Sequence, residues 1–450
     1  MSAPPPRSGV FVSGSILRHV LVMTGSGAVG LVAVFLVDFL TLLYVARLGD
    51  PTATAAVAFA AQAMFIPLSL SIGMTIAVTA VTARALGGGD LATARRLAGS
   101  GLALVAAISG AVSLGLWIFR APFVALIGAQ GAAAQMASAF LAIALPSSAP
   151  LSLGMALSGV LRAKGDARRS MQVTLSGAAV TAALDPILIF GLHLGLFGAA
   201  ITIVVARLAM LAVGWRGAVG AHDMVRRPTR AEAISDLRPF MVIAAPAILT
   251  NLASPAATAF ALSVVSRFGD AAVGALVMSD RVFALAYAPV FALSGSVGAI
   301  LAQNLGARRF ERLRETMRVC LLLSTGYCAA TWAGLHVASP LIARLFDAPE
   351  ESHALFLTFM FWGAAAWMML GWLFVANASF NNLGFPLLST AFNWGRASLG
   401  VMPFVWLGAA WDGARGAAIG MAAGSALFGA AALAATRIVL KRIERRAQAT

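Results

Sequence analysis

The sequence predicts an all-α polytopic membrane protein, with twelve transmembrane helices in two pseudo-symmetric six-helix lobes. Three observations predict this class: the apolar composition, a series of long apolar stretches, and the one-sided distribution of basic residues. Of the 450 residues, 60% are hydrophobic and 11% are charged, and the mean hydropathy is +0.88. A soluble domain of ordinary size does not need so much apolar sequence.

Long apolar stretches recur along the whole chain. A helix of about 20 apolar residues crosses the hydrocarbon core of a bilayer, and twelve stretches reach that length. They lie at residues 20–47, 52–83, 95–119, 132–161, 168–191, 195–220, 238–267, 271–304, 316–339, 353–380, 387–409 and 415–437. Pro67 and Pro289 interrupt the second and eighth stretches at corresponding positions, where kinks are expected.

The basic residues lie mostly on one side of the predicted membrane. With a cytoplasmic N-terminus, 24 of the 32 fall in cytoplasmic segments and five on the opposite side, and Arg207, Arg281 and Arg396 fall within spans. This asymmetry follows the positive-inside rule and predicts that both termini are cytoplasmic. Topology therefore explains the net charge of +15, and nucleic acid is not expected as a partner. Arginine far outnumbers lysine, which indicates a GC-rich bacterial genome, so the expected location is the bacterial cytoplasmic (inner) membrane.

The chain contains an internal repeat at an offset of about 219 residues, with six spans in each copy. Four pairs of loop segments match: LGD at 48–50 with FGD at 268–270, ALGGG at 85–89 with NLGAR at 304–308, LRAKG at 161–165 with FNNLG at 380–384, and GAAI at 198–201 with the same letters at 416–419. Because each copy has an even number of spans, the copies are parallel repeats. Transporters built in this way bind their substrate between the halves and alternate its access.

The repeat divides the chain into five expected parts. A cytoplasmic leader, 1–19, holds three consecutive prolines and no cleavage site, which predicts disorder and not a signal peptide. The N-terminal lobe, 20–221, and the C-terminal lobe, 239–440, are joined by a basic cytoplasmic linker, 222–238. A basic cytoplasmic tail occupies 441–450.

Two aspartates lie within spans of the N-terminal lobe. Asp38 interrupts the apolar run VFLVDFLTLLYVARLGD, and Asp185 directly precedes Pro186 in the fifth span. A charged aspartate at the centre of a transmembrane helix costs roughly 2.5–3.5 kcal/mol, and this cost falls when the carboxyl binds a proton or a cation. Thr181 and Thr202 would add oxygen atoms nearby. We therefore predict that Asp38, Asp185, Thr181 and Thr202 couple transport to an ion.

The coupling ion is expected to be H⁺ or Na⁺, and a Na⁺ ion would bind at Asp38, Asp185 and Thr202. The repeat places Ala257 at the position of Asp38 and Phe404 at that of Asp185, so the C-terminal lobe lacks both acids. The simpler interpretation is that each aspartate only hydrogen-bonds a neighbouring helix. That role gives no reason for acids in one lobe alone, and the asymmetry therefore favours ion coupling.

Further residues within the spans are candidates for lining a substrate cavity. They are Gln62, Met64, Asp280, Arg281, Asn377 and Asn393. Gln62 is the repeat partner of Arg281, and methionine makes an apolar cavity adaptable. Simpler interpretations stay open, because Asp280 and Arg281 can lie near a helix end and extend toward water. The asparagines can equally serve to join neighbouring helices by hydrogen bonds.

Catalytic motifs are not found in the sequence. It has no Walker A segment, and its five histidines are scattered. An enzyme is therefore not expected, and neither is a cofactor other than the coupling ion. The expected partners are small organic substrates and the lipid bilayer, and the expected oligomeric state is a monomer.

Several segments resemble the multidrug and toxic compound extrusion (MATE) family. They are ARLGDPTATAAVA, ARALGGGDLATARR, GVLRAKGDARRSM, LDPILIFGLHLGLFGAAIT, AILAQNLGARRFERLRE and LFDAPEE, and their spacing is kept over almost the whole chain. The resemblance implies twelve helices in two six-helix lobes. It also implies antiport of organic, often cationic, compounds against Na⁺ or H⁺.

Within this family the chain is similar to the bacterial DinF-like branch, whose coupling acids lie in the N-terminal lobe. Asp38, Asp185 and Thr202 match the first-, fifth- and sixth-helix residues of that branch. Thr181 stands where the branch often has asparagine, and the loss of an amide ligand favours H⁺ over Na⁺. The first helix also lacks the proline that bends it in some members.

Two transport functions compete. The first is a secondary active antiporter that exports amphipathic, cationic organic compounds, such as drugs and toxins, by alternating access. The second is a flippase of related fold for a lipid-linked oligosaccharide or another anionic lipid, whose charged group would be met by the arginines within the spans. A non-transporting scaffold is disfavoured, because it gives no reason for acids in one lobe.

Overall fold

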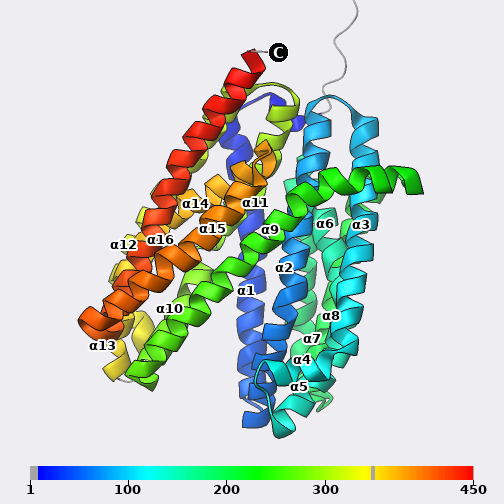
Figure 1. The fold of residues 1–450 in the computed structure, drawn as a ribbon. Coiled ribbons are helices and arrows are strands. Elements are labelled where there is room, and N and C mark those ends of the chain that lie inside the picture. Colours follow the sequence, from blue (N-terminus) through cyan, green and yellow to red (C-terminus); the bar gives the residue numbers. More distant parts are fainter. Residues whose placement is uncertain (1–8, 346–349, 449–450) are drawn as a thin grey trace, which may run out of the picture. The chain divides into compact units, whose positions relative to one another are not determined.

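The computed structural model describes residues 9–345 and 350–448, and helices joined by short loops make up nearly all of this part of the chain (Figure 1). Residues 1–8 of the expected leader, 346–349 of the LFDAPEE segment and 449–450 of the expected tail lie outside the described residues.

Six spans form the first half of the chain. They are α1 (Ile16–Ala46), α2 (Pro51–Gly87), α3 (Leu91–Ile118), α5 with α6 (Gly131–Ala144 and Ser148–Lys164), α7 (Ala167–Pro186) and α8 (Gly195–Trp215). A 3₁₀ turn, η2 (Leu145–Ser147), joins α5 to α6, and α4 (Arg120–Leu126) is a short helix that precedes α5. Wider π-helical turns extend α7 and α8 as η3 (Ile187–Gly191) and η4 (Arg216–Ala221).

The second half repeats this plan. Its spans are α9 (Arg230–Val265), α10 with α11 (Asp270–Ala286 and Ala288–Gly306), α12 (Phe310–Leu345), α13 with α14 (Glu350–Thr358 and Ala364–Leu383), and α15 with α16 (Pro386–Gly395 and Met402–Gln448). Short turns complete it: η5 (Ser266–Phe268), η6 (Phe359–Gly363) and η7 (Arg396–Val401). Asp412 and Gly413 leave the helical conformation and divide α16 into two spans. The expected interruption near Pro289 separates α10 from α11, whereas α2 continues through Pro67.

Ten segments of the described chain are long and apolar enough to cross a membrane, judged by length and composition. One of them, 386–445, contains the break at Asp412 and Gly413 and therefore supplies two spans. The 36-residue helix α12 supplies the remaining one. The described helices thus give the twelve spans that the sequence predicts, six in each half.

The contacts between residues divide the chain into two compact units, which differ slightly from the expected lobes. Unit 1 contains Val29–Ile248, and unit 2 contains Phe11–Ala28 and Leu249–Thr450. The first part of α1 therefore packs with second-half helices, where Gly27 faces Ala292. The first part of α9 packs with first-half helices, where Ile248 covers Gly73.

Each unit is a helical bundle with its own apolar core. In unit 1, α2 packs against α3, α5 and α6, while α8 packs against α6 and α7 (Figure 1). In unit 2, α14 packs against α11, α12 and α16. There the buried ring of Tyr287 stacks on Trp367 with 4.4 Å between centroids, and its hydroxyl donates to Ala364 O at 3.0 Å.

The internal repeat is visible in the backbone conformation. Positive φ angles occur in both halves at matching loop positions, where residues without a side chain are favoured. The pairs are Gly49 (+68°) with Gly269 (+93°), Gly89 (+84°) with Arg308 (+54°), Gly165 (+88°) with Gly384 (+93°), and Gly195 (+53°) with Gly413 (+54°). The loop matches found in the sequence therefore mark equivalent turns.

The GAAI repeat has a steric explanation in both units. A Cβ atom on Gly198 would lie 2.8 Å from the carbonyl oxygen of Leu188, and one on Gly416 would lie 1.9 Å from that of Gly408. In each case the glycine lets the sixth helix of the half touch the backbone of the helix before it. The same letters recur because the same close approach recurs.

The described part of the expected leader, residues 9–19, is ordered, so the prediction of disorder is wrong there. Phe11 is 1% exposed, and its backbone N–H donates to Gln303 Oε1 at 2.8 Å. Arg312 donates to Phe11 O at 2.9 Å and to Gly14 O at 3.0 Å. At the other end, the expected tail continues α16 as far as Gln448, and Glu444 pairs with Arg314 at 2.5 Å.

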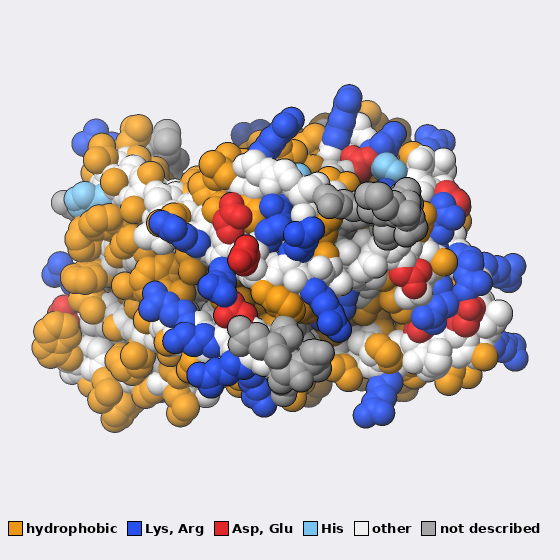
Figure 2. All heavy atoms as spheres, turned by 90° about the horizontal axis from the view of Figure 1, so that it is seen from above, with side chains coloured by type: hydrophobic (Ala, Val, Ile, Leu, Met, Phe, Trp, Pro, Cys, Tyr) orange, Lys and Arg blue, Asp and Glu red, His pale blue; other side chains and the backbone are white. Residues whose placement is uncertain are grey.

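Basic side chains are common on the face of the molecule at which α16 finishes. Figure 2 views the end at which α16 finishes, and it shows many Lys and Arg side chains and fewer Asp and Glu side chains.

Candidate functional site

A buried carboxylate lies among three helices of unit 1. Asp185, in the last turn of α7, is 1% exposed. The hydroxyl of Thr41, on α1, donates a short hydrogen bond to its Oδ2 atom. Thr202, on α8, is fully buried near the same carboxyl, but its hydroxyl donates to Gly198 O at 3.1 Å. The Oδ1 atom of Asp185 is left without a hydrogen-bond partner among the described residues.

The local sequence explains how this site forms. Regular α-helix ends at Pro186, and the π-helical turn η3 follows directly. Gly198 then allows α8 to approach the backbone of η3 at Leu188. Thr202 follows Gly198 by four residues, one helical turn, so the close approach also brings its hydroxyl to Asp185.

Asp38 has different surroundings from Asp185, although the sequence analysis groups them. Its side chain is exposed on α1, and its electrostatic partner is Arg207 on α8. Arg207 also donates to Ala144 O at 3.3 Å, and to Ser147 Oγ at 3.0 Å at the break between α5 and α6. The positive charge of Arg207 therefore compensates the negative charge of Asp38.

The other two predicted coupling residues have separate outcomes. Thr202 lies close to Asp185, as described above. The hydroxyl of Thr181 instead donates to Gly177 O on its own helix, at 3.1 Å. Thr41, the direct donor to Asp185, is not among the residues predicted from the sequence. The sequence feature that points to Thr41 is its position three residues after Asp38, because residues i and i+3 share one face of a helix.

The described residues contain no cluster of three or more His, Cys, Asp or Glu side chains that could hold a metal ion. A cation at Asp185 would therefore be bound by no more than two carboxylates, together with hydroxyl oxygens such as those of Thr41 and Thr202. Oxygen ligands of this kind suit hard cations. The same carboxyl can instead take up a proton without any further ligand.

Polar residues also gather in unit 2, where two of the cavity candidates meet. Asn393 Nδ2 donates to Asn377 Oδ1 at 2.9 Å, and the hydroxyl of Ser389 donates to the same oxygen at 3.1 Å. Both asparagines are buried, at 6% and 8% exposure. Nearby in the chain, Arg396 Nη2 donates to Ser254 Oγ at 2.9 Å. These bonds join α14 with α15, and α9 with η7, as the simpler interpretation of the asparagines expected.

The remaining cavity candidates lie on α2 and α10. Gln62 is exposed on α2, and Met64 is partly buried against the apolar core of unit 1. Asp280 and Arg281 are adjacent on α10, and both are exposed.

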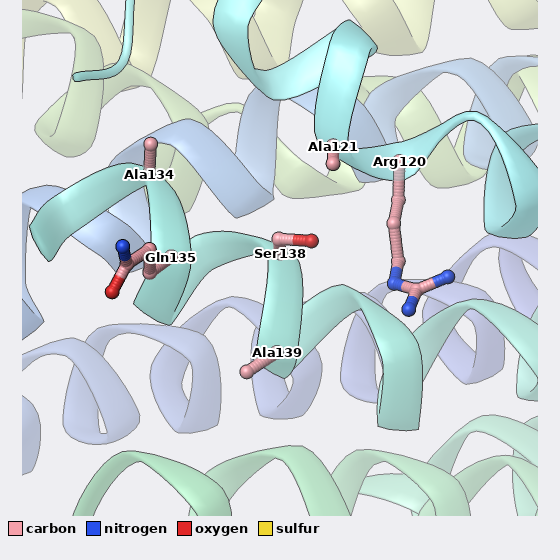
Figure 3. A pocket seen from close by; sticks show the side chains of 6 residues that line it. All are labelled: Arg120, Ala121, Ala134, Gln135, Ser138 and Ala139. Atoms are coloured by element: carbon pink, nitrogen blue, oxygen red, sulfur yellow. The ribbon is translucent and has the colours of Figure 1, made fainter. Parts of the chain in front are cut away.

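A hollow of about 390 Å³ lies between α4 and α5 (Figure 3). The side chains of Arg120, Gln135 and Ser138 line it together with three alanines. Arg120 donates to Trp117 O at 2.7 Å, and its guanidinium lies 5.1 Å from the centre of the Trp117 ring. The hollow contains none of the residues predicted for ion coupling or for the substrate cavity.

Comparison with known proteins decides the family. The family model for MatE matches residues 28–187 and 246–407, more than half of the chain and both halves of the repeat. The chain belongs to the MatE family. The resemblance to MATE transporters is thereby confirmed. The protein is a membrane transporter, not an enzyme.

Two relatives illustrate the range of the family. The chain is 25% identical over 428 residues to a protein of Shewanella oneidensis named FAD transporter, and the match covers 93% of this chain and 94% of the relative. It is 23% identical over 209 residues to the probable multidrug resistance protein YoeA of Bacillus subtilis, and that match covers 44% of this chain and 42% of the relative.

Solved structures show the same fold. One is the Vibrio cholerae MATE transporter VcmN in the bent form, with a TM-score of 0.89, 24% identity, and coverage of 95% of this chain and 98% of that one. Another is a multidrug resistance MATE family transporter in an outward-facing conformation, with a TM-score of 0.92, 18% identity, and coverage of 98% and 100%. At these identities the likeness concerns the fold.

Proposed function

We propose that the protein is a secondary active antiporter that exports amphipathic organic compounds in exchange for H⁺, with Na⁺ as the alternative ion. Asp185 is its coupling carboxylate in this proposal. The observation that carries it is a carboxylate 1% exposed within a membrane-spanning helix, with one oxygen bonded to Thr41 and the other without a hydrogen-bond partner among the described residues.

The chemistry follows from burial. A carboxylate removed from water is costly when charged, so it favours a state in which a proton or a cation neutralises it. Asp38 has Arg207 to balance its charge, whereas hydroxyl groups surround Asp185. Occupancy of Asp185 by an ion therefore changes the local charge from −1 to 0. A change of this kind can favour one of two transporter conformations over the other.

The test uses purified protein in liposomes and the fluorescent organic cation ethidium. A pH gradient and a sodium gradient are imposed separately on the wild type, on Asp185→Asn and on Asp270→Asn. Asp270 is an exposed acid at the start of α10 and serves as the matched control. We expect one gradient to drive transport, and Asp185→Asn alone to abolish it. Wild-type transport by Asp185→Asn would refute the role of this carboxylate.

Cationic substrates are our first proposal, because the ion-coupling acids and the family resemblance both favour them. An anionic aromatic substrate is a second candidate, supported by the relative named FAD transporter and by Arg396. The Nε atom of Arg396 is buried without a hydrogen-bond partner in the described chain, and no ion pair of Arg396 with an acid occurs there. Loading the same liposomes with FAD in place of ethidium, with Arg396→Gln as the variant, separates the two classes.

The flippase remains the alternative function. Arg207 is one of the three arginines within the spans that would meet an anionic lipid group, but it is bound to the α5–α6 break and interacts with Asp38. Translocation of a fluorescent anionic lipid without any ion gradient would support the flippase over the antiporter. We further propose a monomer in the bacterial cytoplasmic membrane with both termini in the cytoplasm. The Lys and Arg side chains on the face drawn in Figure 2 support this orientation.

A further inference from the structure

We propose that a groove on unit 1, between α7 and the end of α8 with η4, binds the phosphate head group and one acyl chain of an anionic phospholipid. The groove encloses about 650 Å³, and its lining carries two arginines, Arg169 and Arg216, and no acidic residue. The helices α7 and α8 lie side by side in unit 1.

The positive charge of the groove is available for a ligand. Arg216 is exposed, and it has no ion pair or hydrogen bond from its side chain to the rest of the described chain. Arg169 donates through Nη1 to Asp166 at 2.7 Å, and the His222 ring lies at the same distance from that carboxylate. Asp166 is therefore already bonded by two neighbours. The two arginines together retain an excess of positive charge that complements a phosphate.

The lining changes from polar to apolar along the groove. Arg169 and Gln172 occupy the first turns of α7, and Leu175 and Ala179 follow deeper in the span. Ten residues separate Arg169 from Ala179, about 15 Å along a helix. Small side chains, including Ser176 and Ala179, leave the space open. A phospholipid has this same order, with an anionic head group followed by an apolar chain.

The position of the groove fits a bilayer boundary. Trp215 precedes Arg216 and is 52% exposed, and tryptophan is enriched where a membrane meets water. Basic pockets between transmembrane helices on the cytoplasmic side bind anionic lipid head groups. The predicted topology places this end of α7 and α8 on the cytoplasmic side. The expected ligand is therefore an anionic lipid of the cytoplasmic leaflet, such as phosphatidylglycerol.

The experiment compares four proteins purified in a neutral detergent: the wild type, Arg216→Gln, Ala179→Phe and Arg168→Gln. Arg168 is an exposed arginine beside Arg169 that does not line the groove, so Arg168→Gln is the charge-matched control. Ala179→Phe fills the apolar part without changing charge, at an exposed position. Lipid retention is measured by native mass spectrometry, and thermal stabilisation by unfolding in added phosphatidylglycerol or phosphatidylcholine.

We expect the wild type and Arg168→Gln to retain phosphatidylglycerol in preference to phosphatidylcholine. Arg216→Gln should weaken that binding about fivefold, the effect of one basic residue near an anionic membrane surface, and Ala179→Phe should abolish the stabilisation. If Arg168→Gln and Arg216→Gln lose equal amounts of phosphatidylglycerol binding, general attraction to a basic surface explains the binding and the proposal is overturned. Unchanged binding by Ala179→Phe would overturn it too, and so would equal stabilisation by inorganic phosphate.

Discussion

The contact between Gly198 and Leu188 allows a sharp test of the site, because one added methyl group perturbs it. In Gly198→Ala the new Cβ would lie 2.8 Å from both the carbonyl carbon and the oxygen of Leu188, and 3.0 Å from Ile189 N. These are backbone atoms, so they cannot rotate away and α8 must shift from η3. Thr202, one turn further along α8, would move with it and away from Asp185.

The magnitude follows from overpacking. An extra methyl group forced into a closely packed site costs about 1–3 kcal/mol. A stability loss of 1 kcal/mol lowers the unfolding midpoint by roughly 2–4 °C for a bundle the size of unit 1. We therefore expect Gly198→Ala to unfold several degrees below the wild type in detergent. We also expect it to lose ion-driven transport in liposomes at temperatures where it is still folded.

Two matched variants make the result interpretable. Gly110 lies within α3 with no atom within 4 Å of a Cβ built on it, so Gly110→Ala should stabilise by about 0.5–1 kcal/mol through helix propensity. Gly416→Ala creates the equivalent clash in unit 2, where no coupling carboxylate is proposed, and should lower stability as well. If Gly198→Ala melts at or above the wild type, as Gly110→Ala should, then the close approach of α8 to η3 does not exist.

Three further predictions concern charged side chains and the repeated turns. Arg96→Gln should lower the free energy of unfolding by roughly 1.5–3 kcal/mol. The reason is that Arg96 donates to the nearly buried carboxylate of Asp236 through bonds of 2.6 and 2.8 Å. The neighbouring Arg95→Gln should lower the free energy of unfolding by less than about 1 kcal/mol, since the side chain of its partner Asp223 is 74% exposed. Similar unfolding midpoints for Arg96→Gln and Arg95→Gln would contradict this difference. Burial raises the pKa of Asp166, but hydrogen bonds from Arg169 and His222 outweigh it and hold the pKa below its usual value. The carboxylate therefore stabilises the fold above about pH 4 and loses that effect as the pH falls further, so Asp166→Asn should flatten the acid side of a melting curve recorded from pH 6 to pH 3. Gly165→Ala and Gly384→Ala should each lower the free energy of unfolding by about 1–2 kcal/mol, because both glycines end a helix at φ near +90°. Thermal or chemical unfolding of the two variants measures this loss, and an unchanged midpoint in either variant would contradict the prediction.

The sequence alone determined the membrane class, the twelve spans and the internal repeat. These features depend on properties that each segment carries by itself. An apolar stretch must cross the bilayer as a helix because its backbone polar groups have no other partner there. A turn with positive φ needs a residue that tolerates it, so Gly165 and Gly384 were visible as a repeated letter before their backbone angles were known.

Only the tertiary structure decided which polar residues meet. Asp38 and Asp185 looked alike in the sequence, yet one is exposed beside Arg207 and the other is buried against Thr41. The partner of Asp185 lies 144 residues away in the chain, and no local pattern records a contact at that separation. The ordered leader has the same cause, because Gln303 and Arg312 hold it from nearly 300 residues further along. Side-chain contacts between distant helices depend on how the helices pack together, and that packing is a property of the whole bundle.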